Sequence, residues 1–373
     1  MKFGFSGEQE EFRGVMRRFL TDRSPTTEVR RLMETPDGWD RNGWRALNTG
    51  LGLTAVHIPE AHGGQGFGYS ELGIVLEEAG RALLCAPLLA TVLAASAIMN
   101  AGTAAEAAAL LPGIAAGDTV ATLAVAEDGG AWDAAGVRLA ATQGAGGWRL
   151  DGGKSYVLDG AAADLIVVLA RSGAERDLSF FTVAGDAPGL SRRALRTIDT
   201  TRRLARLEFA GVPATPLGAP GNAAVPFART MLQAAAMLAN EMVGGAERLR
   251  EDSLAYAKMR FQFGRPIASF QSLKHKAADM LVDVELAKAA AYYAAAALDE
   301  GDEDLAMVCH LAKAAASEAY MQTAIHAVQI HGGIGFTWDN DTQLWFKRAK
   351  GSEVLFGDAH AHREAMMRHM AAA

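Results

Sequence analysis

The stretch that decides the fold is YAKMRFQFGRPIASFQ, residues 256–271. A helical, alanine-rich pattern leads into it, and Gly264 and Pro266 then end that pattern, so the sequence predicts a turn between two helices. Arg260 falls in the last turn of the first predicted helix, where the helix dipole favours a cation. Its guanidinium can also bind phosphate oxygens in a bidentate manner. Taken alone, the stretch favours an ordinary helical hairpin with a surface arginine.

A second motif, QIHGGIGF at residues 329–336, lies at the end of another predicted helix. Its glycines lack a Cβ, so another group can come close to the backbone and meet peptide N–H groups. Their order is not that of the dinucleotide-binding fingerprint and no strand precedes them, which excludes a Rossmann site. Taken alone, the motif favours a helix C-cap, and His331 favours a packed or capping residue over a ligand.

Three regions with different patterns surround these motifs. Residues 1–117 carry apolar residues at three- and four-residue spacing, which predicts a helical domain. Residues 118–216 contain short apolar segments between glycine-rich breaks, which predicts a small antiparallel β-barrel or sandwich. Residues 217–222 are predicted to form a linker, and residues 223–373 a four-helix bundle of long, alanine-rich helices. The predicted fold class is therefore α+β, mostly α, with three domains. Strands are predicted over residues 119–126, 148–151, 165–170, 178–184 and 205–209.

The composition excludes several classes of protein. A net charge of −7 and a pI near 5.8 disfavour a general nucleic-acid role, which needs a basic face. Cys85 and Cys309 are the two cysteines, so no disulfide framework is expected and a reducing compartment is the simplest interpretation. Polar residues or proline interrupt the apolar runs, so we expect a cytoplasmic protein with no membrane span. The histidines near the C-terminus lack the accompanying ligands of a metal site, and no metal is expected.

Taken together, the two motifs and the order of the three regions resemble the acyl-CoA dehydrogenase family. The resemblance covers nearly the whole chain, including the glycine-rich loop at residues 59–68 and the strands at residues 146–170. It implies FAD as cofactor and α,β-dehydrogenation of an acyl-CoA thioester. An electron-transfer flavoprotein is the electron acceptor that the resemblance implies.

The resemblance also implies a cofactor clamp. In that family the ADP half of FAD reaches a neighbouring subunit of a tetramer, which supplies an Arg-x-x-Phe-Gly motif, a following glutamine and a Gln-x-x-Gly-Gly loop. The clamp therefore looks intact in this sequence. Its residues are Arg260, Phe263, Gly264, Gln271, Gln329, Ile330, His331, Gly332 and Gly333.

The reaction side departs from the family pattern. The family places its catalytic glutamate either directly before a glycine, where this chain has Phe356, or near the start of the long helix, where it has Ala234 followed by Ala235. The threonine that approaches the flavin in the family aligns with Leu158, and the threonine after the C-terminal glycine aligns with Asp358. Both base positions therefore lack an acid, and no catalytic residue is predicted with conviction.

Three acids are weaker candidates for a substitute base. Glu241 lies seven residues after Ala234, which is two helical turns and about 10 Å along the axis. That distance is too large for the usual substrate position, so a polar residue beside the bundle or an interface is the better interpretation of Glu241. Glu353 and Asp358 flank Phe356 and would serve only if the loop were rearranged.

This asymmetry resembles the smaller, β-type subunit of α2β2 members of the family. Such a subunit lends its clamp to FAD that reacts in a larger catalytic partner. Three alternatives stay open: a self-sufficient homotetramer that uses Glu241 or a rearranged acid, another flavin chemistry such as monooxygenation, and a structural subunit without flavin. A lost pocket would also suit a bulky substrate such as a steroid side chain.

Overall fold

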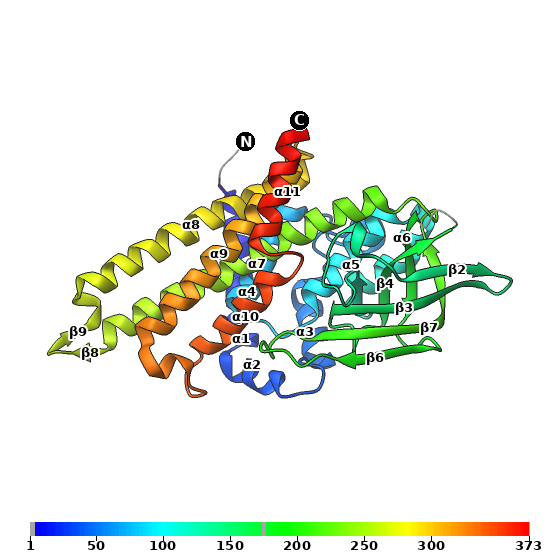
Figure 1. Cartoon of the computed structure of the whole chain (residues 1–373). Coiled ribbons are helices and arrows are strands. Elements are labelled where there is room, and N and C mark those ends of the chain that lie inside the picture. The colour runs from blue at the N-terminus through cyan, green and yellow to red at the C-terminus, as the bar shows by residue number, and fades with distance from the viewer. Residues whose placement is uncertain (1–3, 174–176, 373) are drawn as a thin grey trace. The chain divides into compact units, whose positions relative to one another are not determined.

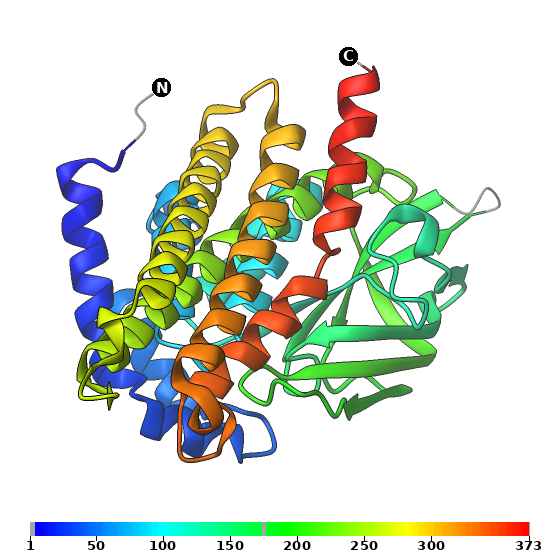
Figure 2. The ribbon, with the colours of Figure 1, turned by 60° about the vertical axis from the view of Figure 1, so that its left-hand side comes forward.

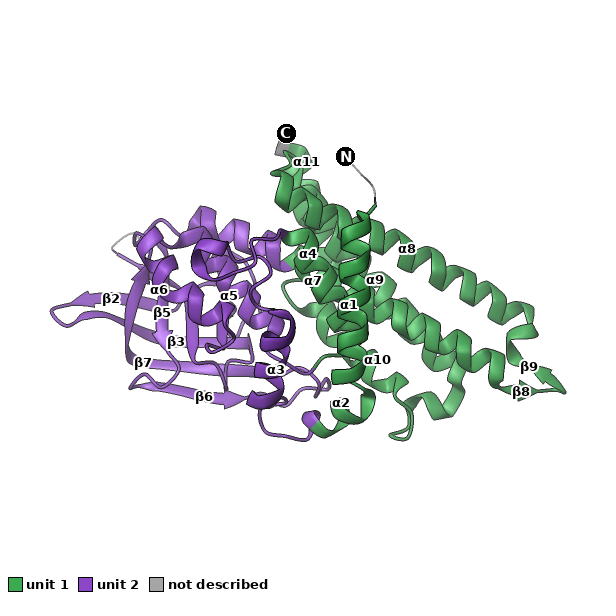
Figure 3. Cartoon of the chain, turned by 180° about the vertical axis from the view of Figure 1, so that it is seen from behind, with its two compact units in different colours: residues 1–31, 69–84, 235–373 green, residues 32–68, 85–234 purple. Residues whose placement is uncertain are grey.

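The computed structural model describes residues 4–173 and 177–372 (Figure 1). Helices come first, strands follow and helices return, which confirms the predicted order. The chain forms two compact units, shown in Figure 3. Unit 1 comprises residues 1–31, 69–84 and 235–373, and unit 2 comprises residues 32–68 and 85–234. The division falls within the long helix α7 (Ala224–Met259). The three predicted domain boundaries, at residues 117, 216 and 223, stay predictions.

Unit 1 is helical. Its N-terminal segments are α1 (Gly7–Arg23), most of α2 (Thr26–Met33) and α4 (Tyr69–Arg81). Its C-terminal helices after α7 are α8 (Gln271–Glu300), α9 (Leu305–His331), α10 (Thr342–Val354) and α11 (Ala359–Ala372). Figures 1 and 2 show α8 and α9 side by side, and α9 also packs against α10 and α11. The described C-terminal region thus adds two shorter helices to the long helices predicted from sequence.

Small residues allow these helices to pack closely. The buried face of α8 consists largely of alanines, among them Ala287, Ala291 and Ala294, and α9 buries a similar series. Alanine costs no side-chain entropy in a helix and keeps the backbones near one another. Sequence composition therefore predicts this bundle well, because close packing here needs small side chains over long helices.

Two glycines fix the crossing of α4 and α7 inside unit 1. A Cβ on Gly80 would lie 1.9 Å from the carbonyl oxygen of Glu241, and a Cβ on Gly244 would lie 1.8 Å from that of Glu77. Each glycine therefore receives a backbone carbonyl of the other helix. No side chain can be accommodated at either position without separating the two helices.

Unit 2 contains a seven-stranded sheet, three α-helices that lie wholly within it and the start of α7 up to Ala234. The helices are α3 (Arg41–Leu51), α5 (Leu88–Ala101) and α6 (Ala104–Ala115). The strands are β1 (Ala121–Ala124), β2 (Ala140–Gly144), β3 (Gly147–Leu158), β4 (Leu165–Ser172), β5 (Asp177–Ala184), β6 (Leu190–Ala194) and β7 (Leu204–Leu217). Strand β5 pairs with both β7 and β4, so the pairings close into a ring.

The prediction of a wholly antiparallel sheet is wrong. Strand β4 pairs in parallel with β1 and, further along, with β2, while the other pairings of this sheet are antiparallel. Strands β2 and β6 were also missed, because their exposed or small residues give no alternating apolar signal. Two further two-residue strands, β8 (Phe261–Gln262) and β9 (Arg265–Pro266), form a separate hairpin in unit 1.

Strand β4 separates the two cores of unit 2. Val167 and Leu169 belong to the core shared with α5, whereas Ile166, Val168 and Ala170 face the interior of the ring. Burial of both faces explains why β4 is continuously apolar. Helix α5 is almost entirely buried, which explains why most of its 14 residues are apolar. No described helix combines the length and the hydropathy needed to cross a membrane.

We expect Gly244→Ala to destabilise the fold, because the new methyl group would overlap the carbonyl of Glu77. Overpacking of this kind costs about 1–3 kcal/mol or more. The matched control is Gly14→Ala in α1, where the nearest atom to the new methyl is the flexible end of Arg18 at 3.6 Å. That change should gain up to about 1 kcal/mol from helix propensity. Urea unfolding of both variants measures the difference, and equal effects would contradict the assigned α4–α7 crossing.

Candidate functional site

The hairpin after α7 presents an arginine and a phenylalanine to solvent. Phe263 and Gly264 form its two-residue turn with positive φ angles of 53° and 74°, the combination that suits tight β-hairpins. Arg260 follows the last residue of α7 directly, and its carbonyl accepts a hydrogen bond of 2.8 Å from Ile267 N–H. The Phe263 side chain is 91% exposed. The chain thus fixes the hairpin backbone while leaving these two side chains on the surface.

The structure brings the two sequence motifs together. The rings of Tyr256, near the end of α7, and His331, at the end of α9, stack with centroids 4.3 Å apart. Ile330 packs in the same small core with Ala257 of α7 and Met280 of α8. Ile330 and His331 are therefore buried, and any contact that they make with a cofactor would involve their backbone. Their side chains hold the glycine loop against the hairpin.

The backbone conformation or packing requires glycine at some positions of the second motif and not at others. Gly332 ends α9 with φ 68° and ψ −149°, a conformation that side chains rarely adopt. Gly335 packs tightly, because a Cβ there would lie 2.9 Å from the Cβ of His331. A Cβ on Gly333 would meet no described atom within 4 Å, and its φ is ordinary. Nothing in the described chain therefore requires glycine at position 333, and its backbone is open to an approaching group.

These features fit the predicted dinucleotide clamp. Arg260 and Gln271 are exposed, and Gln329 is exposed apart from a bond of 2.9 Å that its Oε1 accepts from Lys276 Nζ. A guanidinium, amide groups and open backbone N–H groups are suitable donors for phosphate oxygens. Exposed apolar side chains surround them. These are Met259, Phe261, Phe263, Ile334, Phe336 and Trp338. A surface of this kind is typical of an interface with another chain.

The position of the family base is an apolar, strained turn. Phe356 is buried and has a positive φ of 59°, and Gly357 follows with φ 106°. A bulky residue with positive φ costs free energy and persists only where its surroundings hold it. The turn is held by Lys313, whose Nζ donates to the carbonyl oxygens of Glu353 at 2.9 Å and Gly357 at 2.8 Å.

Lys313 was missed by sequence reasoning. Its side chain is fully buried on α9, and its Nζ also lies 3.0 Å from Ser317 Oγ. Burial lowers the pKa of Lys313 to about 7, although Asp358 and Glu353 oppose that shift. The available signal was its place on the buried stripe of α9, four residues before Ser317. A lysine on an apolar helix face indicates a buried donor.

None of the three weaker acid candidates is positioned as a free base. Glu241 is buried and pairs with Arg348 at 3.0 Å. Asp358 accepts a hydrogen bond of 2.8 Å from Ala361 N–H and so caps the start of α11. Glu353 pairs with Lys350 at 2.5 Å on the surface of α10. Each carboxylate therefore already has a structural partner.

Strand β3 carries an apolar residue at the position that aligns with the family's flavin-contacting threonine. Leu158 is buried at the end of β3, and its carbonyl accepts a bond of 2.6 Å from Thr122 Oγ1. Lys154 lies fully buried nearby in sequence and binds Glu127 at 2.9 Å. Burial lowers the pKa of Lys154 to about 8, although Glu127 opposes that shift. Sequence reasoning did not find this buried pair, because nothing local distinguishes Lys154 from a surface lysine.

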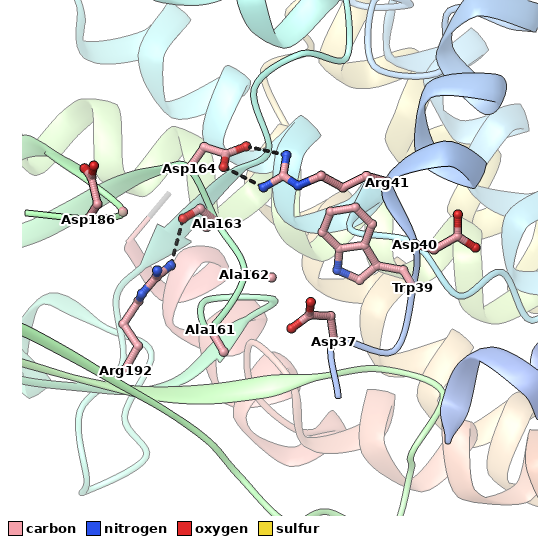
Figure 4. Close-up of a pocket in the computed structure, with 11 residues that line it drawn as sticks. Asp37, Trp39, Asp40, Arg41, Ala161, Ala162, Ala163, Asp164, Asp186 and Arg192 are labelled. Atoms are coloured by element: carbon pink, nitrogen blue, oxygen red, sulfur yellow. Dashed lines mark hydrogen bonds and ion pairs between the residues drawn. The ribbon is translucent and has the colours of Figure 1, made fainter. Parts of the chain in front are cut away.

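A cavity of about 650 Å³ lies in unit 2 beside the start of α3. Figure 4 shows Arg41 gripping the carboxylate of Asp164 with both terminal nitrogens, while Arg192 donates to the carbonyl of Ala163 at 2.9 Å. The Arg41 partner lowers the pKa of Asp164, although burial alone would raise it. The two arginines that line this cavity therefore bind residues that also line it, and these contacts hold loop 161–164 in place.

Comparison with known families matches three consecutive segments. Residues 6–118 match the acyl-CoA dehydrogenase N-terminal domain, residues 122–212 the middle domain and residues 227–371 the C-terminal domain. Together these segments cover most of the chain.

Individual relatives agree over nearly the full length. "Acyl-CoA dehydrogenase IpdE2" of Mycobacterium tuberculosis is 34% identical over 357 residues, which are 93% of this chain and 92% of the relative. A solved "Tcur3481-Tcur3483 steroid ACAD" variant is 31% identical with a TM-score of 0.88, covering 98% of this chain and 99% of the other. The ChsE4-ChsE5 complex from Mycobacterium tuberculosis is 27% identical with a TM-score of 0.90 and covers 100% of both chains.

We expect Lys313→Met to change how stability depends on pH. In the folded chain Lys313 loses its proton near pH 7, whereas in the unfolded chain it does so near 10.5. Between these values the unfolded state binds the extra proton, so Lys313 makes the free energy of unfolding rise with pH. The variant should lack this contribution. Urea unfolding from pH 6 to about 10 measures both slopes, and Lys274→Met controls for loss of an exposed lysine. Parallel curves for Lys313→Met and the native chain would contradict the assignment.

Proposed function

The chain belongs to the acyl-CoA dehydrogenase family, and on that basis we propose that it is the base-lacking subunit of a two-component enzyme. The family membership makes it an oxidoreductase with FAD as cofactor. In the proposed assembly, Arg260 and the glycine loop hold the ADP half of FAD whose flavin ring reacts in a larger partner subunit. When bound, FAD supplies the acceptor for the hydride that leaves the β-carbon of the acyl thioester.

One observation carries this proposal: the positions where the family places its base are buried and apolar. Phe356, Ala234 and Ala235 occupy them. Abstraction of a weakly acidic α-proton needs a carboxylate within hydrogen-bonding reach, shielded from water. Glu241 is the nearest acid along α7, and its charge is neutralised by Arg348. A chain with these residues requires the acid to come from elsewhere.

The clamp supports the same division of labour. Its arginine and glycines remain accessible, its two halves are joined by the Tyr256–His331 stack, and exposed aromatic side chains surround it. A surface arginine that only solvates a helix end needs no neighbouring glycine with an open backbone. A dinucleotide presented by another chain needs both, because its pyrophosphate approaches the backbone while the guanidinium binds the phosphate charge.

Two similar structures suggest a class of substrate to test. One similar structure is described as a steroid acyl-CoA dehydrogenase and another as a complex of two named proteins. We therefore place a bulky acyl-CoA, such as one with a steroid side chain, first among the substrates to test. An electron-transfer flavoprotein is the proposed electron acceptor.

Co-expression tests the proposal directly. The chain alone is expected to hold little flavin and to leave acyl-CoA unchanged, whereas co-expression with a base-containing relative should give a yellow, active complex. Within that complex, Arg260→Ala should lower the flavin bound per chain, since a charge-assisted hydrogen bond contributes about 1.5–3 kcal/mol. Lys258→Ala, an exposed cation two residues earlier, is the matched control. Flavin absorbance after gel filtration measures the content.

Two outcomes would count against the heteromeric assembly. The first is a yellow protein from the chain alone that is bleached by acyl-CoA, which would show a self-sufficient enzyme. The second is a complex whose flavin content is unaffected by Arg260→Ala, which would remove the clamp from the mechanism.

We expect Glu241→Gln to lower stability far more than turnover. Removing the charge of one partner of a buried ion pair costs about 3–5 kcal/mol. Turnover per folded, flavin-loaded complex should change less than about 10-fold, whereas loss of a general base costs about 10²–10⁴-fold. The double variant Glu241→Gln with Arg348→Met should recover much of the stability. Complete loss of turnover with flavin retained would identify Glu241 as the base.

A further inference from the structure

A second cavity, of about 250 Å³, lies within unit 1, away from the hairpin and glycine loop in sequence. Side chains from α1, α4, α7 and α10 and from the turn between α1 and α2 line it. Its polar lining is mainly cationic or hydroxylic. These residues are Arg17, Thr21, Ser24, Thr26, Glu78, Arg81, Arg248 and Trp345.

The lining contains three arginines and one glutamate. Arg17 and Glu78 neutralise each other through bonds of 2.6 and 3.0 Å. The remaining charged groups of the lining are Arg81 and Arg248. Their carboxylate partners, Glu251 and Asp252, are not part of the lining and are substantially exposed. Each guanidinium group is therefore paired just outside the lining, so the cavity presents guanidinium N–H groups and not an unopposed positive charge.

Two buried donors in the lining have no acceptor. Trp345 is 3% exposed, and its indole Nε1 has no hydrogen-bond partner among the described residues. Nη1 of Arg81 also has no hydrogen-bond partner among the described residues, although Nη2 of the same side chain binds Glu251. A buried donor without an acceptor costs about 1–3 kcal/mol, and more when it is charged. Two such donors from different helices, both lining one cavity, indicate an acceptor between them.

The N-terminal end of α2 also contributes to this cavity. Pro25 and Thr26 line the cavity, and α2 begins at Thr26, so the positive end of its dipole lies at the cavity wall. The hydroxyl groups of Thr21 and Ser24 are occupied by backbone carbonyls, at 2.7 and 3.1 Å. The available donors are thus the indole, the guanidinium groups and the helix N-terminus, which are the groups that bind oxyanions.

We propose that this cavity is a binding site for a small tetrahedral oxyanion of the phosphate class. The donors come from α4, α7, α10 and the start of α2, so they are not arranged as the planar fork that suits a carboxylate. A tetrahedral oxyanion presents acceptor oxygens in several directions, and the cavity is large enough to hold it. The bound anion would join four helices of unit 1. This site does not depend on the proposed subunit role.

Equilibrium dialysis of the purified full-length chain against radiolabelled inorganic phosphate tests the site. Saturable binding of one phosphate per chain is expected, with displacement by sulfate and by methyl phosphate but not by acetate at equal ionic strength. Displacement by methyl phosphate as effective as that by phosphate would assign a phosphomonoester group, and weaker displacement would assign the free ion. Both results support the oxyanion site.

Two variants and a control locate the binding. Trp345→Phe keeps the ring and removes only the N–H, and Arg81→Gln removes the unpaired guanidinium donor. Each should weaken phosphate binding by about 10-fold or more, the loss expected for one hydrogen bond to a charged group. Arg363→Gln, an exposed arginine paired with Glu318, should bind like the native protein. Near-ultraviolet circular dichroism confirms that each variant is folded.

Three results would overturn the proposal. One is no saturable phosphate binding through the millimolar range in the native protein. Another is unchanged binding in folded Trp345→Phe and Arg81→Gln proteins. The third is acetate competing as strongly as phosphate, because a site built for a tetrahedral oxyanion must discriminate against a planar carboxylate.

Discussion

The contact between Tyr256 and His331 is the constraint on which the clamp depends. Helices α7 and α9, of 36 and 27 residues, end next to each other where these rings stack and Ile330 packs beside them. The arginine follows one helix end and the glycine loop follows the other. If the ends separated, the donors of the proposed clamp would no longer converge on one ligand. Unremarkable packing residues thus fix the geometry of exposed polar ones.

Charged and polar side chains lie in different environments near the hairpin and around Phe356. Near the hairpin the charged and amide side chains reach solvent. Around Phe356 and along α7, the polar groups are turned to structural use: Lys313 binds carbonyl oxygens, Glu241 pairs with Arg348, and Asp358 caps a helix. These polar residues hold the backbone, because satisfied hydrogen bonds stabilise a fold and free carboxylates in a dry pocket do not.

The sequence predicted the order of helices and strands, the long C-terminal helices and the breaks at Gly264 and Gly332, because these depend on local periodicity and backbone freedom. It missed β2 and β6, whose residues are too small or too exposed to show alternation, and the parallel pairings of β4, which depend on partners distant in the chain. It also missed Lys313 and Lys154, since burial of a lysine is decided by tertiary contacts. For Glu241 it identified the residue but not its partner, because Arg348 is more than one hundred positions away.

The exposed tip of the hairpin has a consequence for the life of the chain in a cell. Phe263 and its apolar neighbours offer an adhesive surface to chaperones and proteases for as long as no other polypeptide covers them. Chaperones and proteases would then bind the chain whenever this surface is uncovered. The steady-state amount of this polypeptide would follow the supply of whichever molecule covers the tip, so its abundance would be matched to its companion without a dedicated regulator.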